Sequence, residues 1–397
     1  MLIRSIHKIN LLFIFLFTIP QAYAKVDPAI LLANNYLSHN PPESLVWDWR
    51  GSIFTYGLSE YARSLPKGTD KTKFINFIKT YHDEWAKKGI PTIDHSDHCP
   101  SALSLLALKK MAVPGLRIEA LEKVANYIRT QKRNDIGALD HLGTLPVYPH
   151  SIWVDSLMMY GLFAVQYGVE NHEPALRDFG TKQISIFAKA LQDPNDHLFR
   201  HARYEGDEIS KNYGSRSEVV SAIYQDHGSV LPKEAAYWLR GNSWVLVSSV
   251  EMLDELSAGS EKDAILKIVR SQAEAVLKYQ QTSGLWRTLM NLDAVNQNPS
   301  YEESSGSALV AYAFAHAAHR GYLPKSYLLS AEKAYQALLK KLKPTDQGLS
   351  LTQNSMGTEP FPPLVYTQIK LIDDAAYGVG GFLMLSGELN DKEKSKL

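Results

Sequence analysis

Apolar residues recur along most of the chain at the spacing of amphipathic helices. Leu157, Tyr160, Gly161 and Ala164 stand at positions i, i+3, i+4 and i+7 and therefore share one helix face. Asp or Ser precedes such runs and Gly or Pro follows them, as is typical of helix ends. No stretch alternates apolar and polar residues for long enough to predict a large sheet. The pattern predicts helices over residues 28–38, 53–64, 71–88, 101–111, 116–131, 152–168, 172–191, 216–226, 234–256, 260–279, 304–320, 325–342 and 366–386.

These predicted helices come in pairs joined by polar turns, and no Ser/Gly-rich or charged linker divides the chain. Twelve or thirteen helices in antiparallel hairpins are what a ring of six hairpins requires. In such a ring each inner helix buries both faces and each outer helix buries one. We therefore predict an all-α fold, an (α/α)6 barrel, with residues 25–397 in a single domain. An open helical solenoid would have a similar periodicity.

The first 24 residues have the composition of a cleavable signal peptide. Arg4 and Lys8 precede an apolar run from Leu11 to Ile19, and small residues before position 25 suit a cut after Ala24. The run is shorter than the roughly 20 residues that span a bilayer, which disfavours a membrane anchor. We expect a periplasmic or secreted protein without membrane attachment after cleavage.

Charge and cysteine content narrow the function classes. The chain has 42 basic and 42 acidic residues, so its formal net charge is zero. Binding of nucleic acid through phosphate neutralisation needs an excess of positive charge, so nucleic acid is not an expected partner. Cys99 is the only cysteine, which excludes an internal disulfide and leaves the hydrophobic core to stabilise an exported chain. The sequence does not indicate an oligomeric state.

Tryptophans stand beside charged or amide residues at the junctions between predicted helices. A sugar ring has an apolar face that stacks on aromatic side chains and a hydroxyl rim that needs hydrogen-bonding partners. Such segments therefore suit a saccharide pocket, although core tryptophans with polar neighbours would give the same pattern. The segments are residues 47–50 (WDWR), 153–155 (WVD), 238–244 (WLRGNSW) and 284–286 (GLW).

Asp155 is the sharpest candidate for a catalytic group. It lies between Trp153 and an apolar helix that contains Leu157, Met158 and Met159. Desolvation raises the pKa of a carboxyl group toward the range in which it donates and retrieves a proton near neutral pH. The structural alternative is a helix N-cap, a position that Asp favours.

The segment Asp94-His95-Ser96-Asp97-His98 offers a second acidic group. Its spacing does not match the common metal motifs, so we predict no metal. A carboxylate here, paired with Asp155, fits glycoside chemistry better. Asp97 is our choice for that second carboxylate, and Asp94 is the alternative.

Three basic side chains complete the candidate set. Arg240 stands between Trp238 and Trp244, and a guanidinium flanked by aromatics presents a bidentate fork to an anionic sugar. A salt bridge to a neighbouring helix is the alternative. His141 and His201 lie near predicted turns, where they serve either a site or the surface.

Six segments in order along nearly the whole mature chain, from Trp47 to Leu385, match one set of motifs. IWVDSLMM (152–159) is similar to a W-x-D segment and WLRGNSW (238–244) to a W-x-R-G-N-G-W segment. Together they resemble the unsaturated glucuronyl and rhamnogalacturonyl hydrolases, glycoside hydrolase families 88 and 105. The other four segments are SDHCPSAL (96–103), GLWRTLM (284–290), EESSGSAL (302–309) and YGVGGFLML (377–385).

The chain also departs from the family pattern. Ser243 stands where the family usually has Gly, and residues 201–204 (HARY) replace H-x-W-D, which suits a different neighbouring sugar. His141 matches a family histidine if the loop before Trp153 is a few residues longer than usual.

The resemblance implies hydrolysis of an oligosaccharide whose non-reducing end is a uronic acid with a C4–C5 double bond. Water adds across that bond: Asp155 protonates C4 and then activates the water, while Asp97 holds ring hydroxyls or tunes Asp155. No metal or organic cofactor is implied, and neither the origin of the uronic acid nor the next sugar is defined. The substrate-binding residues that it implies are His98, His141, Trp153, His201, Trp238, Arg240, Asn242 and Trp244.

Two other classes of function fit parts of the sequence. Another sugar enzyme on the same barrel, a 2-epimerase or an inverting glycosidase, would share the fold, but an epimerase needs paired histidines at the centre where this chain has carboxylates. A non-catalytic glycan-binding scaffold would tolerate Asp155→Asn.

Overall fold

The structure is a computed structural model that describes residues 26–143, 145, 150–204, 237–291, 300–360 and 363–390. The predicted signal peptide, residues 1–24, and the predicted helix over residues 216–226 lie outside the described residues. No helix among the described residues has the length and apolar character needed to cross a membrane.

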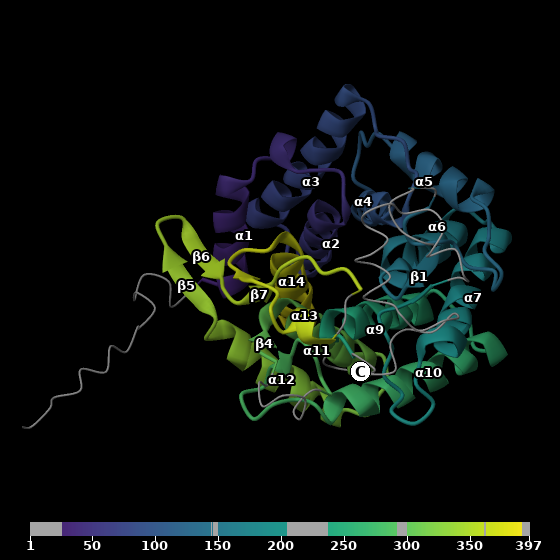
Figure 1. Cartoon of the computed structure of the whole chain (residues 1–397). Helices are drawn as coiled ribbons and strands as arrows, with labels where there is room; N and C mark the ends of the chain where they lie inside the picture. The colour runs from purple at the N-terminus through teal and green to yellow at the C-terminus, as the bar shows by residue number, and fades with distance from the viewer. Residues whose placement is uncertain are drawn as a thin grey trace, which may run out of the picture.

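Six helices of the described chain form a closed inner ring (Figure 1). Each packs against the next in chain order, and the last packs against the first, so the ring closes instead of continuing as a solenoid. The prediction of an (α/α)6 barrel is therefore confirmed. The inner helices are α2 (Trp49–Ser64), α4 (Ser101–Lys110), α6 (Leu162–Glu170), α9 (Leu239–Asp254), α11 (Ser304–His319) and α14 (Ala376–Asn390).

Among the described residues, six outer helices surround this ring, each against the inner helix that precedes or follows it in the chain or, for α1, against α14. Outer helices bury one face only: in α3 the buried residues include Phe74, Phe77, Ile78 and Tyr81, at helical spacing. The outer helices are α1 (Pro28–His39), α3 (Thr69–Lys88), α5 (Glu119–Thr130), α7 (Pro174–Leu191), α10 (Ser260–Leu277) and α12 (Ser326–Leu339).

The ring closes through glycines. A Cβ atom on Gly57 of α2 would lie 2.3 Å from the carbonyl oxygen of Gly380 in α14, and one on Gly380 would lie 2.4 Å from the carbonyl oxygen of Ile53. Both distances are far inside van der Waals contact, so the two backbones approach as closely as they do because neither residue has a side chain.

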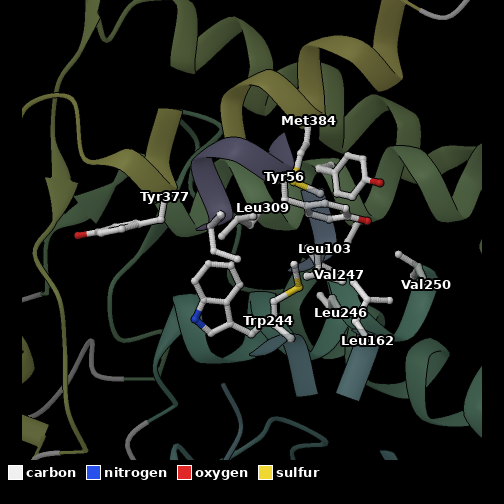
Figure 2. Close-up of a cluster of buried hydrophobic side chains, with 14 of the residues drawn as sticks. Tyr56, Leu103, Leu162, Trp244, Leu246, Val247, Val250, Leu309, Tyr377 and Met384 are labelled. Atoms are coloured by element: carbon white, nitrogen blue, oxygen red, sulfur yellow. The ribbon is translucent and has the colours of Figure 1, made fainter. Parts of the chain in front are cut away.

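One apolar core fills the ring. The inner helices contribute side chains that meet on its axis, among them Tyr56, Leu103, Leu162, Leu309 and Met384 (Figure 2). Trp244, predicted to bind substrate, is fully buried in this core between α9 and its neighbours.

Within the described part of the chain, eight short strands form four two-stranded antiparallel sheets, which agrees with the absence of a long alternating pattern. They are β1 (Ser151–Trp153) with β2 (Ala202–Tyr204), β3 (Trp286–Arg287) with β4 (Glu302–Glu303), β5 (Leu342–Thr345) with β6 (Gly348–Leu351), and β7 (Asn354–Ser355) with β8 (Leu371–Ile372).

Several predicted helix boundaries were wrong. The helix predicted from residue 234 begins at Leu239. The helix predicted from residue 152 begins at a π-helical turn, Leu157–Gly161, because residues 151–153 pair as β1 instead. The helix predicted over residues 366–386 is divided into α13 (Pro363–Tyr366), β8 and α14, with Asp374 in a left-handed conformation (φ 49°) before α14 begins. The helix predicted from residue 53 begins four residues earlier, since Asp48 caps it.

Candidate active site

Backbone hydrogen bonds bring four distant segments side by side at one end of the ring. Ser96 N donates to His141 O (2.8 Å), and His141 N donates to Ser151 O (2.8 Å) at the start of β1. β1 pairs with β2, and Val154 N donates to His201 O (2.9 Å). Five side chains are aligned by this ladder: Asp97, His141, Trp153, Asp155 and His201.

Asp155 and His201 form a buried pair. His201 Nε2 lies 3.1 Å from Asp155 Oδ2, and the two residues are 2% and 8% exposed. Asp155 lies two residues before the π-helical turn, a feature that is frequent at functional sites. Its carboxylate bonds to His201, and no side chain caps the turn. The geometry therefore favours the site role of Asp155 over the capping alternative.

The acidity of Asp155 differs from the expectation based on its apolar neighbours. Burial raises the pKa of Asp155. The interaction with His201, its hydrogen bond and the interaction with His141 together lower this pKa by more than burial raises it, so the pKa lies below its usual value. Burial lowers the pKa of His201, and Asp155 opposes this only in part. Both directions describe an ionised carboxylate beside a neutral imidazole in the free protein. The expectation of a raised Asp155 pKa considered desolvation alone and is wrong for this state.

Asp97 and His141 form a second pair of the same kind. His141 Nε2 lies 3.3 Å from Asp97 Oδ1, and its Nδ1 lies 2.9 Å from Ser156 Oγ. His141 is 1% exposed, so the imidazole is held between two side chains. Two carboxylates thus face the site, each with its own histidine.

Tryptophans separate and flank the two pairs. The Trp153 ring stacks on His141 (centroids 4.3 Å apart, planes at 15°) and meets His201 edge-on at 5.8 Å. Trp238 covers His201 from the other side, with the ring centroids 4.2 Å apart. The indole nitrogen of Trp238 is buried and has no hydrogen-bond partner within the described part of the chain.

A pocket with a volume of about 180 Å³ opens over these side chains. It contains both carboxylates together with the aromatic walls, and its one Lys or Arg side chain among the described residues is Arg50. Trp49 and Arg50 belong to the tryptophan segment noticed in the sequence, whereas nothing in the sequence indicated the wall formed by residues 357–359. The lining residues are Trp49, Arg50, Asp97, His141, Leu142, Trp153, Asp155, Met159, Trp238, Gly357, Thr358 and Glu359.

The family model for Glycosyl Hydrolase Family 88 matches residues 25–391. The chain belongs to this family. It is therefore a glycoside hydrolase, and the resemblance drawn from the six segments is confirmed.

Individual relatives agree with this placement. The chain is 27% identical over 327 residues to an unsaturated rhamnogalacturonyl hydrolase, YesR, of Bacillus subtilis, covering 80% of this chain and 84% of that protein. It is 26% identical over 241 residues to an unsaturated 3S-rhamnoglycuronyl hydrolase of an Alteromonas species, covering 60% of this chain and 50% of the relative.

Solved structures share the fold. A family 105 glycoside hydrolase of C. acetobutylicum superposes with a TM-score of 0.73 at 22% identity, covering 93% of this chain and 99% of that one. An unsaturated glucuronyl hydrolase from Bacillus sp. GL1 superposes with a TM-score of 0.66 at 16% identity, covering 90% and 94%.

In this family 88 enzyme, Arg240 does not line the pocket. It is fully buried, and its guanidinium carbon lies 4.8 Å from the Trp238 ring centroid and 4.6 Å from that of Tyr377. The guanidinium donates to Ser305 Oγ and to the carbonyl oxygens of residues 355 and 356, and also to Thr358 Oγ1 (2.8–3.2 Å). The structure therefore places it behind the wall formed by residues 357–359, and the predicted clamp on the substrate carboxylate is wrong in this geometry.

Four other predicted binding residues also lie outside the pocket lining, and His201, which bonds to Asp155, is one of them. Asn242 is fully buried and bonds to the backbone N–H and carbonyl of Phe199 (2.8 and 2.9 Å), two residues before His201. Trp244 lies in the apolar core. His98 donates from Nδ1 to the carbonyl of Thr92 (3.1 Å). Asn242 thus supports the segment that carries His201.

Asp94 belongs to a separate cluster beside the pocket. Asp94, His95 and His98 each bring one potential metal-ligand atom within 4.8 Å of the others. His95 Nδ1 lies 2.6 Å from Asp94 Oδ1, and His98 Nδ1 donates to the carbonyl of Thr92. Hydrogen bonds within the protein therefore account for the Nδ1 atom of each histidine. Of the two alternatives for the second carboxylate, Asp97 lines the pocket.

Proposed function

We propose that this enzyme removes a 4,5-unsaturated uronic acid from the non-reducing end of an oligosaccharide released by a polysaccharide lyase. The observation that carries the proposal is the meeting of two carboxylate–histidine pairs, Asp155–His201 and Asp97–His141, at one pocket with tryptophan walls. The named relatives act on unsaturated rhamnogalacturonyl and rhamnoglycuronyl substrates, which supports this substrate class.

The pocket suits a single terminal sugar. Its volume of about 180 Å³ is smaller than the ~300–1,000 Å³ of sites that enclose drug-sized ligands. Trp153 and Trp238 offer apolar faces for a ring. The substrate carboxylate would meet Arg50, the pocket's cation within the described residues.

Substrate binding raises the pKa of Asp155 and so allows it to act as a proton donor. In the free protein its carboxylate is ionised, but an anionic sugar that displaces water from the pocket disfavours a second negative charge and raises the Asp155 pKa. The enzyme therefore takes up a proton as the substrate binds, and Asp155 is then able to give it away.

The reaction consumes one water molecule. Asp155 gives its proton to C4, so that the C4–C5 π bond becomes a C4–H bond and positive charge develops at C5 and the ring oxygen. Water adds to C5 and returns a proton to Asp155, which acts as base in this step. The resulting hemiketal opens by breaking the C5–O5 bond, which gives a ketone at C5 and a hemiacetal at C1. The hemiacetal then breaks down to an aldehyde at C1 and releases the next sugar with its hydroxyl group. Because C1 is not attacked directly, carboxylate separation does not report retention or inversion here.

Asp97 and His141 would hold the ring hydroxyls. The Asp97 carboxylate offers acceptor oxygens to these hydroxyls, and His141 holds it in place. The chain's own residues provide each of these functions, so the proposal includes no metal or organic cofactor.

The site of action is proposed from the sequence. The N-terminal signal of residues 1–24 supports export and cleavage after Ala24, which would give a periplasmic or secreted enzyme with a single catalytic domain over residues 25–397. Lyase products of pectin, glycosaminoglycans, ulvan or arabinogalactan would be encountered there.

The test is loss of the ultraviolet absorbance of the conjugated double bond in a panel of lyase-generated disaccharides. We expect wild-type enzyme to remove the absorbance of at least one of them and Asp155→Asn to lower kcat by at least about a hundredfold, because general acid–base catalysis contributes roughly 10²–10⁴-fold. Asp94→Asn changes a neighbouring carboxylate outside the pocket lining and serves as the matched control with near-normal turnover.

The same assay separates the other functions. An epimerase or an inverting glycosidase would change its substrate without destroying the chromophore, and a binding scaffold would retain its function in Asp155→Asn. Near-normal turnover in folded Asp155→Asn would exclude Asp155 as the proton donor.

A further inference from the structure

A third side chain extends the Asp155–His201 pair. The Tyr366 hydroxyl lies 2.7 Å from His201 Nδ1, on the opposite edge of the imidazole from Asp155. Tyr366 is 1% exposed and ends α13, more than 160 positions beyond His201 in the sequence. We propose that Tyr366 is a positioning residue whose hydroxyl lets the Asp155–His201 pair gain and lose its catalytic proton.

The ionised pair needs a hydrogen-bond donor at Nδ1. A neutral imidazole carries one N–H, and Nε2–H is the arrangement that bonds to the Asp155 carboxylate. Nδ1 then has a lone pair inside the protein, and the Tyr366 O–H donates to it. This is the state of the free enzyme, because the shifts in both pKa values favour carboxylate and neutral imidazole.

The protonated pair needs the opposite partner at the same place. When the pair itself holds the added proton, one hydrogen lies in the bridge between Asp155 Oδ2 and His201 Nε2 and a second hydrogen lies on Nδ1. This holds whether the bridging hydrogen is bonded to the oxygen or to the nitrogen. Nδ1–H then requires an acceptor, and the Tyr366 oxygen becomes that acceptor when its hydrogen rotates away. A hydroxyl both donates and accepts, so it satisfies the two protonation states in one position.

No other described group contacts Nδ1 in this way. Trp238 packs against the His201 ring, Trp153 meets it edge-on, and neither side chain carries a charge. His141 and Arg240 are the remaining titratable or charged groups that act on His201, both through their charge, and Asp97 is paired with His141. Their charges favour one protonation state of the Asp155–His201 pair, whereas the Tyr366 hydroxyl forms a hydrogen bond with His201 in both states.

Tyr366→Phe therefore removes the hydroxyl and keeps the ring. The ring packs with Trp238 and Leu289 in a small apolar cluster, which the substitution preserves. A buried N–H without an acceptor is less tolerable than a nitrogen lone pair without a donor. We expect the pair to bind its proton about tenfold more weakly in Tyr366→Phe, which moves its titration about one pH unit downward.

The first measurement uses the full chain without substrate. The ¹⁵N shifts of His201 are followed against pH in wild type and Tyr366→Phe, with Tyr61→Phe as a matched control. Tyr61 is another fully buried tyrosine, whose hydroxyl donates to Asp27 (2.8 Å) outside the site. A downward shift in Tyr366→Phe alone supports the proposal. An unchanged titration in the folded variant overturns it, as does a wild-type His201 that is already imidazolium at neutral pH.

The second measurement is the pH profile of kcat/KM, which rests on the proposed function. Activity requires the protonated pair, so the alkaline limb should move downward by about one unit in Tyr366→Phe, whereas a purely structural role would lower the rate without moving the limb. A fluorinated tyrosine at position 366, which is a weaker acceptor of the same shape, should shift the limb in the same direction by less. No ultraviolet loss with any disaccharide would contradict the proposed function and leave the ¹⁵N test of Tyr366 standing.

Discussion

Two arginines near the pocket differ in what their guanidinium groups contact. Arg240 is fully buried and its NH1 and NH2 atoms bond to four protein oxygen atoms. The Arg50 side chain is 56% exposed, lines the pocket and holds one ion pair, to Asp48 at 2.7 Å. The NH1 and NH2 groups of Arg240 are occupied by these oxygen atoms inside the protein, so Arg50 is the arginine that is able to meet an anionic sugar.

Substituting both arginines by glutamine separates binding from stability. Arg50→Gln should raise KM about tenfold with little change in unfolding free energy, because it removes one exposed charge from the pocket. Arg240→Gln should lower the unfolding free energy by about 3 kcal/mol, since it leaves several buried acceptors without their donor. Urea denaturation and steady-state kinetics measure both. A stable Arg240→Gln enzyme with the larger rise in KM would return the clamp to Arg240.

The arginines also show what residue types reveal before a structure exists. Aromatic neighbours correctly indicated a guanidinium between rings, with Trp238 on one side. The second ring is Tyr377 rather than Trp244, and two of the acceptors are carbonyls more than 110 positions later in the chain. The residues next to Arg240 in the sequence indicate the kind of contact that its side chain makes. They do not indicate which distant backbone atoms accept its hydrogen bonds.

At the scale of elements, periodicity predicted the helices and missed the strands that build the site. Helices depend on neighbours three and four positions apart, which a single sequence displays. β1 and β2 are three residues each, and Trp153 pairs with Ala202 about 50 positions away, so neither strand has a periodic signal of its own. Asp155 and Asp97 could be chosen because they precede helices in recognisable motifs; Tyr366 could not, because only the tertiary fold brings it to His201.

Closure of the ring makes an element-scale prediction. Gly380→Ala would place a Cβ atom 2.4 Å from the Ile53 carbonyl oxygen, and backbone does not give way as a flexible side chain does. We expect a loss of about 3 kcal/mol or more in unfolding free energy, at the upper end of overpacking costs. Gly381→Ala in the same helix is the matched control, since its Cβ would meet the Leu309 side chain at 3.1 Å and should cost about 1 kcal/mol or less. Equal losses in the two variants would contradict backbone contact as the cause.

At the scale of the whole molecule, the inner helices share one direction relative to the site. Asp97, Asp155 and Trp238 come just before the first turns of inner helices, and Trp49 is the first residue of α2. Helix N-termini carry partial positive charge, so this end of the barrel favours an anionic substrate although the chain has no net charge. The opposite, C-terminal ends hold carboxylates, and histidines neutralise them.

His316 is the centre of that opposite end and links three inner helices. Its Nε2 lies 2.9 Å from Asp254 of α9, and its Nδ1 lies 3.0 Å from Glu388 of α14. Burial alone lowers the pKa of His316, but the two hydrogen bonds and the charge of Glu388 raise it to about 10. An unfolded histidine titrates near 6.5, so the imidazolium bridge contributes its full stability below about pH 6.5 and loses it as pH rises through about 10.

The stability difference between wild type and His316→Gln should therefore be largest at pH 6 and shrink steadily up to pH ~10, where the bridge loses its proton. Glutamine keeps one hydrogen bond but not the positive charge, so it leaves the buried Glu388 and the solvent-accessible Asp254 partly uncompensated at every pH. Urea unfolding at several pH values measures the difference, and His39→Gln, at an exposed histidine of α1, reports the background dependence. Parallel curves for wild type and His316→Gln across this range would show that the bridge is not charged. The bridge lies at the opposite end of the inner helices from Asp155. His316→Gln should therefore change the pH dependence of catalysis only under conditions in which the barrel itself unfolds.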